Sequence, residues 1–504
     1  MAAPQPAPGP FLWGVSTSGY QHEGGYNGPG QPRNNWAAWE ENGRAEPTGR
    51  SVDFWNHFEE DIDRAASLGL NSFRLGIEWT RLQPEPRYSP SNEPLFDPKV
   101  LARYADILLA ARRRRLEPLL TLHHFTHPAW LGPDFWLEPT APDRFVAFAQ
   151  TAMILLNRAL ADRGEAPLHW FVTINEPNML ALSTYLTGTF PSGPKRGIAP
   201  LIQAAQGLIL AHIRTYRSLH QTYAREGWPT PMISFNNYAS DLYWMDKLIT
   251  DLVAAPGLGV HRGDLAWWLV GRAHRFDERF NAAHLPLSKT LPYWMGALIK
   301  HTLLAIGHRL LETGQLERFA DAVYAEDAGL PLDYLAFDYY DPFVGNLFRL
   351  PRWDELFHPG LSLRARLLQS ITSKTWDWPA LPQGLSFFVR IYEEDYPGKP
   401  ILITENGMAR LRRSTWQRSW RKDQLRRADY LDRHLAEVTK LRRQGSALSG
   451  YFHWSLTDNY EWGSFAPKFG LFEVDLNHPD LPRQAVDSAG LNAAETYRRW
   501  IASS

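Results

Sequence analysis

The chain has 504 residues, of which 44% are hydrophobic and 21% are charged, and its formal net charge is −1. These values predict a soluble globular protein with a substantial core, and a charge so close to zero argues against nucleic acid or an anionic membrane as a partner. The chain contains no cysteine, which excludes disulfides, thiolate nucleophiles and cysteine-ligated zinc.

The N-terminal segment MAAPQPAPGP is rich in Pro and Ala, and it has neither the basic start nor the apolar core of a secretory signal. We therefore expect residues 1–9 to form a flexible arm and residues 10–504 to form a single catalytic domain. No stretch approaches the run of about 20 apolar residues that a membrane span needs. Together with the lack of cysteine, these features predict a cytoplasmic protein.

Eight short β-rich runs alternate along the chain with amphipathic helical stretches. The β-rich runs cover residues 11–18, 71–79, 117–125, 169–177, 232–238, 333–340, 400–406 and 450–459. The helical stretches cover residues 53–68, 98–114, 143–158, 202–225 and 423–442. This alternation indicates an α/β protein with a parallel sheet, and eight units predict a single (β/α)8 TIM barrel.

Two connections in this pattern are long. Residues 239–331 follow the fifth β-rich run and are rich in aromatic residues, and residues 347–381 precede the seventh run. We expect both to be elaborated βα loops that cover the active face, the first with helices of its own, and to contribute to specificity.

Polar and ionisable residues gather where the predicted strands end. In a barrel, the C-terminal strand ends and the loops after them form the active face. The aromatic share of 13%, with 21 Trp and 20 Tyr, suits a site that stacks on sugar rings. The strand-end residues are Gln21, Glu23, Arg74, Glu78, His123, His124, Asn175, Glu176, Glu405, Asn406 and Asp458.

Two of these strand ends carry a glutamate in a strongly polar setting. Glu176 lies in WFVTINEPN and Glu405 lies in PILITENGM. Either residue alone is equally well explained as a strand-end cap or as half of a salt bridge. Taken together, they indicate the two carboxyl groups that flank a glycosidic bond when it is hydrolysed with retention.

With these motifs the chain resembles family 1 glycoside hydrolases. TINEP resembles the acid/base motif of the family and ITENG its nucleophile motif, which implies those roles for Glu176 and Glu405. The resemblance implies a retaining exo-β-glycosidase of the β-glucosidase type, with side activity on β-galactosides and β-fucosides. It also implies a small β-glycoside or oligosaccharide substrate, and no cofactor or metal ion.

Further motifs of the family follow in order along the chain. GPFLWGVSTSGYQHEGG, FRLGIEWTRLQP, LTLHHFTHPAWL and YFHWSLTDNYEW resemble its first, second, third and last strand motifs. The resemblance implies a substrate-binding set of Gln21, His124, Asn175, Trp454, Glu461, Trp462 and Phe469, and a supporting pair of Arg74 and Tyr340.

These roles place opposite demands on the two glutamates. A nucleophile must be ionised, and we expect Arg74 to hold the pKa of Glu405 down. An acid must be protonated at rest, so we expect Glu176 to lie in a less polar and negatively influenced site.

Several positions depart from the usual pattern of the family and leave the substrate preference open. Phe125 stands where Trp is usual, and Glu78 replaces a commoner small residue. Asp338 stands where Asn is usual, and this extra carboxyl could either raise the pKa of a neighbour or be neutral itself. The loop between Trp462 and Phe469 is one residue shorter than usual.

Three alternatives compete with the β-glucosidase interpretation. A 6-phospho-β-glycosidase would share Phe125, but such enzymes replace the glutamate that Glu461 matches and add a Lys/Tyr phosphate clamp. A metal-dependent hydrolase would use His123, His124 and His127, although adjacent strand residues point to opposite faces. A non-catalytic sugar-binding relative would have lost one of the two glutamates.

Overall fold

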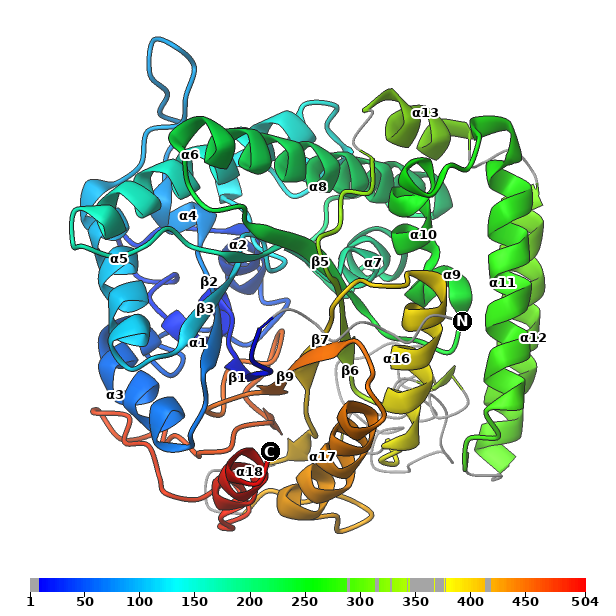
Figure 1. The fold of residues 1–504 in the computed structure, drawn as a ribbon. Helices are drawn as coiled ribbons and strands as arrows, with labels where there is room; N and C mark the ends of the chain where they lie inside the picture. The colour runs from blue at the N-terminus through cyan, green and yellow to red at the C-terminus, as the bar shows by residue number, and fades with distance from the viewer. Residues whose placement is uncertain are drawn as a thin grey trace.

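In the computed structural model, the described residues are 9–287, 291–312, 317–326, 329–341, 343–344, 367, 376, 378–412 and 418–504. Eight parallel strands close into a barrel in the order β1-β2-β3-β4-β5-β6-β7-β9 (Figure 1). This confirms the predicted (β/α)8 barrel. The strands are β1 Leu12–Ser16, β2 Ser72–Gly76, β3 Glu117–Thr121, β4 Trp170–Asn175, β5 Met232–Tyr238, β6 Leu335–Tyr339, β7 Ile401–Asn406 and β9 Leu448–Trp454.

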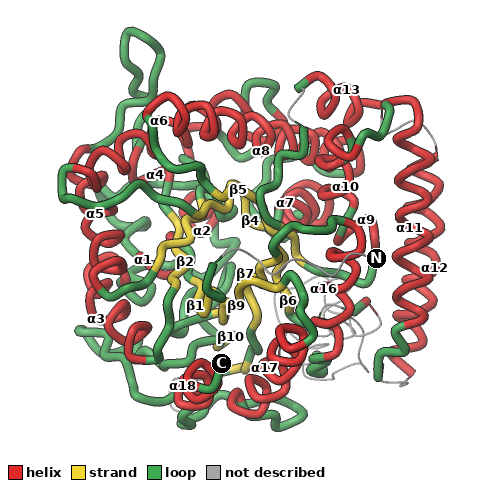
Figure 2. Tube along the Cα trace, viewed as in Figure 1, coloured by secondary structure: helices red, strands yellow, loops and turns green. Residues whose placement is uncertain are grey.

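Helices surround the barrel, as Figure 2 shows by the red helices around the yellow strands. The five predicted helical stretches are confirmed. The second of them begins where the Asp97 side chain accepts hydrogen bonds from the backbone N–H groups of Lys99 and Val100. The helices between and after the strands are α3 Phe54–Ser67, α5 Pro98–Arg113, α6 Ala141–Ala161, α8 Ile198–Glu226, α16 Gln383–Asp395, α17 Arg427–Arg443 and α18 Ala493–Ala502.

Residues 239–331 form the elaborated loop that the sequence predicted, with helices of its own. Two long helices of this loop, α11 and α12, lie side by side at the periphery of the molecule (Figure 1). Residues 1–8, and most of residues 347–381, lie outside the described residues. The helices of the loop are α9 Tyr243–Asp246, α10 Leu248–Ala254, α11 Leu265–Ala282, α12 Leu291–Glu312 and α13 Glu317–Ala325.

Shorter elements complete the loops around the barrel. None of the helices in the described part of the chain is long and apolar enough to cross a membrane. The shorter elements are α1 Gly19–Glu23, α2 Asn35–Glu41, α4 Trp79–Leu82, α7 Pro177–Ala181, a π-helix Leu182–Thr187, 3-10 turns Ala129–Leu131, Phe135–Leu137, Pro256–Leu258 and Arg262–Asp264, and the two-stranded sheet of β8 Arg410–Leu411 and β10 Pro467–Lys468.

Several predicted strands are too long at their C-terminal ends. The predicted run 450–459 ends as β9 at Trp454, and the run 71–79 ends as β2 at Gly76. The polar residues after these points leave the sheet and enter loops at the barrel mouth. After Gly76 the chain enters helix α4, which begins at Trp79, and after Trp454 the backbone of Thr457 pairs with Phe472 instead of with a barrel strand.

The barrel interior has an apolar end and a polar end. A Cβ on Gly14 would lie 2.3 Å from Cδ1 of Phe452, so glycine at this position makes room for that ring inside the barrel. Arg74, on β2, is fully buried and begins the polar end. The apolar interior consists of Leu12, Leu119, Val172, Tyr334, Ala336, Leu402 and Phe452.

Candidate active site

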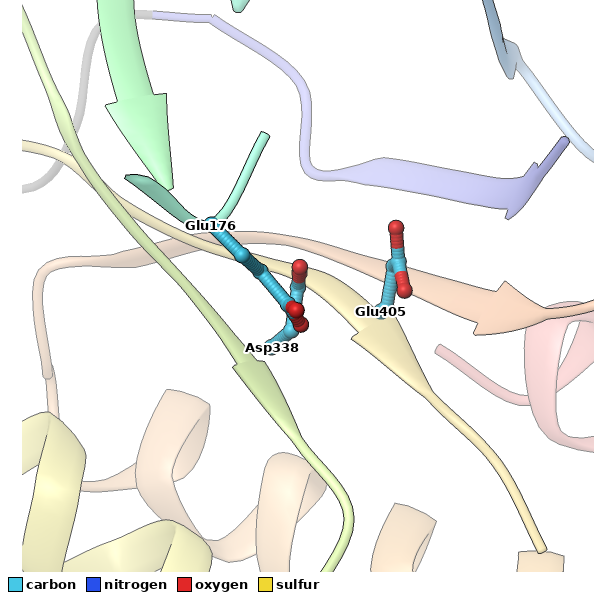
Figure 3. A group of neighbouring side chains, drawn as sticks. All are labelled: Glu176, Asp338 and Glu405. Atoms are coloured by element: carbon cyan, nitrogen blue, oxygen red, sulfur yellow. The ribbon is translucent and has the colours of Figure 1, made fainter. Parts of the chain in front are cut away.

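Three carboxyl groups converge at the polar end of the barrel. Glu176 directly follows β4, Asp338 lies on β6 and Glu405 lies on β7. One carboxyl oxygen from each residue lies within 4.8 Å of the corresponding oxygens of the other two. Figure 3 shows the carboxyl ends of Glu176 and Asp338 pointing toward one another, with Glu405 to one side. The structure therefore brings the two predicted glutamates together and adds a third acid.

Glu405 is held by two donors. Arg74 Nη1 lies 2.5 Å from its Oε1, and the Tyr340 hydroxyl donates a hydrogen bond of 2.7 Å to its Oε2. Burial raises the pKa of Glu405, whereas Arg74 and Tyr340 oppose that rise. Arg74 thus lowers this pKa as expected, but the net shift is upward because the loss of hydration outweighs the guanidinium.

Among the described side chains, none forms a salt bridge with the Glu176 carboxyl, and the charge of Arg74 is only the smallest of the effects on its pKa. Its backbone adopts the left-handed region, with φ of 38°, and its N–H donates to the carbonyl of Asn236 at 2.9 Å. Burial, followed by the negative charges of Asp338 and Glu405, raises the pKa of Glu176 well above its ordinary value. The expectation of a less polar, negatively influenced site for this residue is confirmed.

Asp338 lies between the other two carboxyl groups and a set of neutral donors. Thr404 Oγ1 donates to its Oδ1 at 2.6 Å, and Asn236 Nδ2 donates to its Oδ2. Arg74 Nη1 lies 4.0 Å from its Oδ1. Burial and the charge of Glu405 raise the pKa of Asp338 well above its ordinary value. The departure noted in the sequence thus belongs to the centre of the site.

A cavity of about 520 Å³ opens over these groups. A volume of this size suits a small-molecule ligand. Among its described lining residues three are Glu and none is Lys or Arg. The lining consists of His124, Phe125, Asn175, Glu176, Met179, Leu182, Phe190, Tyr238, Ser240, Met245, Tyr340, Val344, Trp378, Glu405, Trp454, Glu461, Trp462, Pro467 and Phe469.

The family model of glycosyl hydrolase family 1 matches residues 4–255 and 272–494, which is most of the chain. The chain belongs to glycosyl hydrolase family 1. It is a β-glycosidase, and its substrate is a small-molecule glycoside.

Similar proteins point to two kinds of family 1 enzyme. A 6-phospho-β-galactosidase of Lacticaseibacillus rhamnosus is 28% identical over 96% of both chains, and one of Clostridium acetobutylicum is 25% identical over 92% of both. The structure of a β-glucosidase from Thermotoga maritima in complex with castanospermine also matches. The match covers 99% of this chain and 98% of the Thermotoga chain. The structure matches with a TM-score of 0.68 and 22% identity, which shows the fold.

Glu461 lies in the cavity wall within a small hydrogen-bond network. Trp454 Nε1 donates to its Oε1 at 2.9 Å, and Gln21 Nε2 donates to its Oε2 at 3.3 Å. Burial raises the pKa of Glu461 to about 8, although the Trp454 hydrogen bond opposes this. Gln21 is itself fully buried and lies behind Glu461, outside the described lining.

His124 lies between two tryptophan rings of the family 1 site. Its ring centroid is 5.9 Å from Trp454 and 5.6 Å from Trp462, both nearly parallel. Asn175 Nδ2 lies 3.3 Å from His124 Nε2. Burial, and then the charge of Arg74, lower the pKa of His124 well below its ordinary value, so the imidazole is neutral. Phe469 lines the cavity and packs edge-on against Tyr340.

The metal alternative placed on three histidines does not find support. His123 packs against Trp136, and His127 Nε2 lies 3.0 Å from the Gly132 carbonyl. In the described part of the chain, these rings and His124 do not form a group with converging ligand atoms. Their environments differ, since His123 packs against Trp136 and Phe145, whereas His124 packs against Trp454 and Trp462.

Some functional neighbours were missed in the sequence. Asn236 Nδ2 also donates to Asn175 Oδ1 at 2.7 Å and so links two strands beneath the cavity. Tyr238 lines the cavity two residues later on β5. Both belong to the polar end of a predicted strand, the signal that identified the other strand ends. The apolar lining residues come from the helices and loops that follow the strands and carried no such signal: Met179, Leu182, Phe190, Met245, Val344 and Trp378.

Two strand-end glutamates lie elsewhere. Glu23 and Glu78 are buried outside the described cavity lining, where Glu23 Oε2 lies 2.6 Å from Arg81 Nε. Glu78 Oε1 accepts hydrogen bonds from the Tyr20 backbone and the Thr126 hydroxyl. Glu23 and Glu78 therefore follow the C-terminal ends of β1 and β2 but, unlike the carboxylate pair, do not line the described cavity.

Proposed function

We propose that this family 1 enzyme is a retaining exo-β-glycosidase of the β-glucosidase type, with Glu405 as nucleophile and Glu176 as acid/base. The observation that carries the proposal is the approach of their carboxyl oxygens to within 4.8 Å. Retaining enzymes hold the two carboxyl groups about 5–5.5 Å apart, whereas inverting enzymes leave about 6.5–9.5 Å for a water molecule.

The first half of the reaction forms a covalent intermediate. The Glu405 carboxylate, oriented by Arg74 and Tyr340, attacks the anomeric carbon, and the bond from that carbon to the leaving oxygen breaks. Glu176 transfers its proton to the leaving oxygen. Its raised pKa supplies that proton near neutral pH.

The second half releases the sugar. Esterification removes the negative charge of Glu405, which had helped to raise the pKa of Glu176. Glu176 now ionises more readily and takes a proton from water. The water oxygen attacks the anomeric carbon, the ester bond to Glu405 breaks, and the sugar leaves with its configuration retained.

The remaining proposed residues hold the sugar. A pyranose presents an apolar C–H face that can stack on the Trp454 indole, and the Glu461 carboxyl can bind sugar hydroxyls from the same wall. Gln21 acts by orienting Glu461. The other proposed contacts are His124, Asn175, Trp462 and Phe469, and the preferred sugar is a β-glucoside, with side activity on β-galactosides and β-fucosides.

The names of similar proteins make 6-phospho-β-galactosides the second candidate substrate. The site argues against a phosphate group, because its described lining contains three Glu and no Lys or Arg. A phosphate dianion that enters this cavity would lose its hydration without a cation in the described lining to pair with. Measuring kcat/KM for nitrophenyl β-glucoside and its 6-phosphate separates the candidates, and a preference for the phosphate would contradict our proposal.

A mechanism-based trap tests the proposed roles. We expect 2-deoxy-2-fluoro-β-glucosyl fluoride to add one glycosyl group per chain, detected by intact mass, and peptide mapping to locate it on Glu405. As a matched pair, azide should restore activity to both E405G and E176A with an activated substrate, giving the α-glucosyl azide with E405G and the β-glucosyl azide with E176A. An adduct elsewhere, or the opposite pair of anomers, would reject the assignment.

A further inference from the structure

The catalytic centre contains more acid than a nucleophile and an acid/base require. Asp338 occupies a position where the family usually has Asn, which cannot ionise, and it is fully buried beside Glu176 and Glu405. The mechanism described above uses only the two glutamates. The third carboxyl must therefore either hold a proton itself or change how its neighbours hold theirs.

The charged and titratable groups that face Asp338 lie on or directly after four other strands and its own strand, β6. Arg74 is the one cation among the described groups that act on it, while Glu405 and Glu176 are the acids. The Tyr340 hydroxyl donates to Glu405, and Tyr238 faces Glu176 and Asp338 as an un-ionised phenol. One guanidinium cannot neutralise three buried carboxylates, so at least one of them retains a proton.

The contacts show where the negative charge is best tolerated. Glu405 has both Arg74 and Tyr340 as donors, which favours its ionised form. Asp338 also receives a donor on each oxygen, from Thr404 and Asn236. By contrast, no donor to the Glu176 carboxyl is present among the described side chains, and this carboxyl points toward that of Asp338. Glu176 is thus the acid that keeps the proton.

We propose that Asp338 is a positioning residue that accepts a hydrogen bond from protonated Glu176. This contact keeps the acid/base protonated and orients its carboxyl toward the site. The inference rests on the function proposed above. Asn at this position could accept the same hydrogen bond only as a neutral group, whereas the carboxylate attracts the proton electrostatically and strengthens the bond.

The same contact helps both halves of the reaction. When Glu176 protonates the leaving oxygen, its O–H bond breaks and two carboxylates then face each other. The repulsion between the Glu176 and Asp338 carboxylates favours transfer of a proton from the attacking water to Glu176. This transfer is the general-base step in the second half of the reaction. Asp338 gains and loses no proton in this cycle, since it only accepts the hydrogen bond before and after.

The variant D338N tests this inference through the pH profile of kcat/KM. With phenyl β-glucoside, whose poor leaving group needs the acid, we expect the basic limb to move down by about one pH unit. At pH 8, kcat/KM of D338N should fall relative to the wild type about tenfold more with phenyl β-glucoside than with 2,4-dinitrophenyl β-glucoside. The leaving group of the dinitrophenyl substrate needs little protonation. D338E should restore part of the basic limb.

Two controls separate this inference from other causes. D341N removes a nearby buried carboxyl that accepts from the Leu381 N–H instead of facing Glu176, and it should leave the basic limb unmoved. The fluoroglucosyl trap should still label D338N on Glu405, because its fluoride leaving group needs little acid, whereas absence of labelling in the wild type would reject the proposed function. A normal trap reaction with an unmoved basic limb, or equal losses for both aryl glucosides, would overturn the role of Asp338.

Discussion

Two buried charge clusters in this enzyme differ in their balance. Beside α10, Asp251 and Asp395 face the cations Lys247 and Arg272, with Lys247 Nζ 2.8 Å from Asp395 and Arg272 Nη2 3.1 Å from Asp251. In the catalytic centre three carboxyl groups face Arg74 alone among the described cations. In the first cluster Asp251 and Asp395 face at least as many cations, since Arg275 also pairs with Asp395, whereas in the second three acids face one cation.

The pKa directions follow this difference. Burial by itself would raise the pKa of Asp251, but Lys247 and Arg272 outweigh it and the pKa is lowered. The pKa values of Glu176, Asp338 and Glu405 are all raised. A matched cluster holds its charges permanently and supports the fold, whereas an unmatched one must hold protons that it can give away.

Removing an acid from the matched cluster should cost stability and little activity. D251N leaves Lys247 and Arg272 with one buried partner, and we expect the free energy of unfolding to fall by about 3–5 kcal/mol. In the remaining folded protein kcat should be unchanged, because no member of this cluster lines the described cavity. Urea unfolding checks this against D63N, an exposed partner of Arg114 that should cost at most about 1 kcal/mol. Equal losses of unfolding free energy in D251N and D63N would contradict the distinction between this buried cluster and a surface ion pair.

Removing a donor from the unmatched cluster in the catalytic centre should cost activity and little stability. Y340F deletes the 2.7 Å hydrogen bond to Glu405, which is worth about 1.5–3 kcal/mol for a charged acceptor, so we expect kcat/KM to fall by about 10- to 150-fold. The acid limb of the pH profile should move to higher pH, because a factor that lowers the pKa of Glu405 is lost. An unmoved acid limb would show that Tyr340 does not act through Glu405.

The Glu23–Glu78–Arg81 cluster is intermediate in charge balance, because two buried acids lie beside one cation. Burial, and then the charge of Glu23, raise the pKa of Glu78 to about 8. Because this value exceeds that of the unfolded chain, near 4.5, the stability due to the bound proton is complete below pH 4.5 and is lost as the pH rises to about 8. Glutamine cannot ionise, so E78Q should show a Tm that improves on the wild type increasingly from pH 5 to pH 8 and then levels off.

The control for this smallest effect is E85Q. Glu85 is exposed and pairs with Arg87 at the surface, so its substitution should shift Tm by the same small amount at every pH. A pH-independent difference between E78Q and the wild type would show that Glu78 is already ionised at pH 5, and two buried acids would then be tolerated beside one arginine.

The barrel and the catalytic pair were predictable from the sequence for local reasons. Strand and helix periodicity depends on neighbouring residues, and each of the two glutamates lies in a short motif at a strand end, TINEP or ITENG. Parallel closure then brings distant strand ends to one face. The resemblance to the family implied that Arg74 and Tyr340 lie near Glu405, which the hydrogen bonds confirm.

Other features depend on distances between strands and could not be read locally. Glu78 and Glu405 both follow predicted strands, yet one is buried beside Arg81 and the other lies in the cavity. The effect of Asp338 was left open because it depends on which donors surround it. Arg74 lowers the Glu405 pKa as expected, but the net shift is upward because burial, which a sequence does not quantify, exceeds the effect of Arg74.

The sequence alone determined the fold class, the family resemblance and the two glutamates proposed for catalysis, because these follow from periodicity and short motifs. Only the tertiary structure decided which carboxyl faces which donor, how far burial raises each pKa, and that three acids share one arginine. Hydrogen bonds and hydration act over a few ångströms between residues that are hundreds of positions apart in the chain, as in the contact of Arg74 with Glu405.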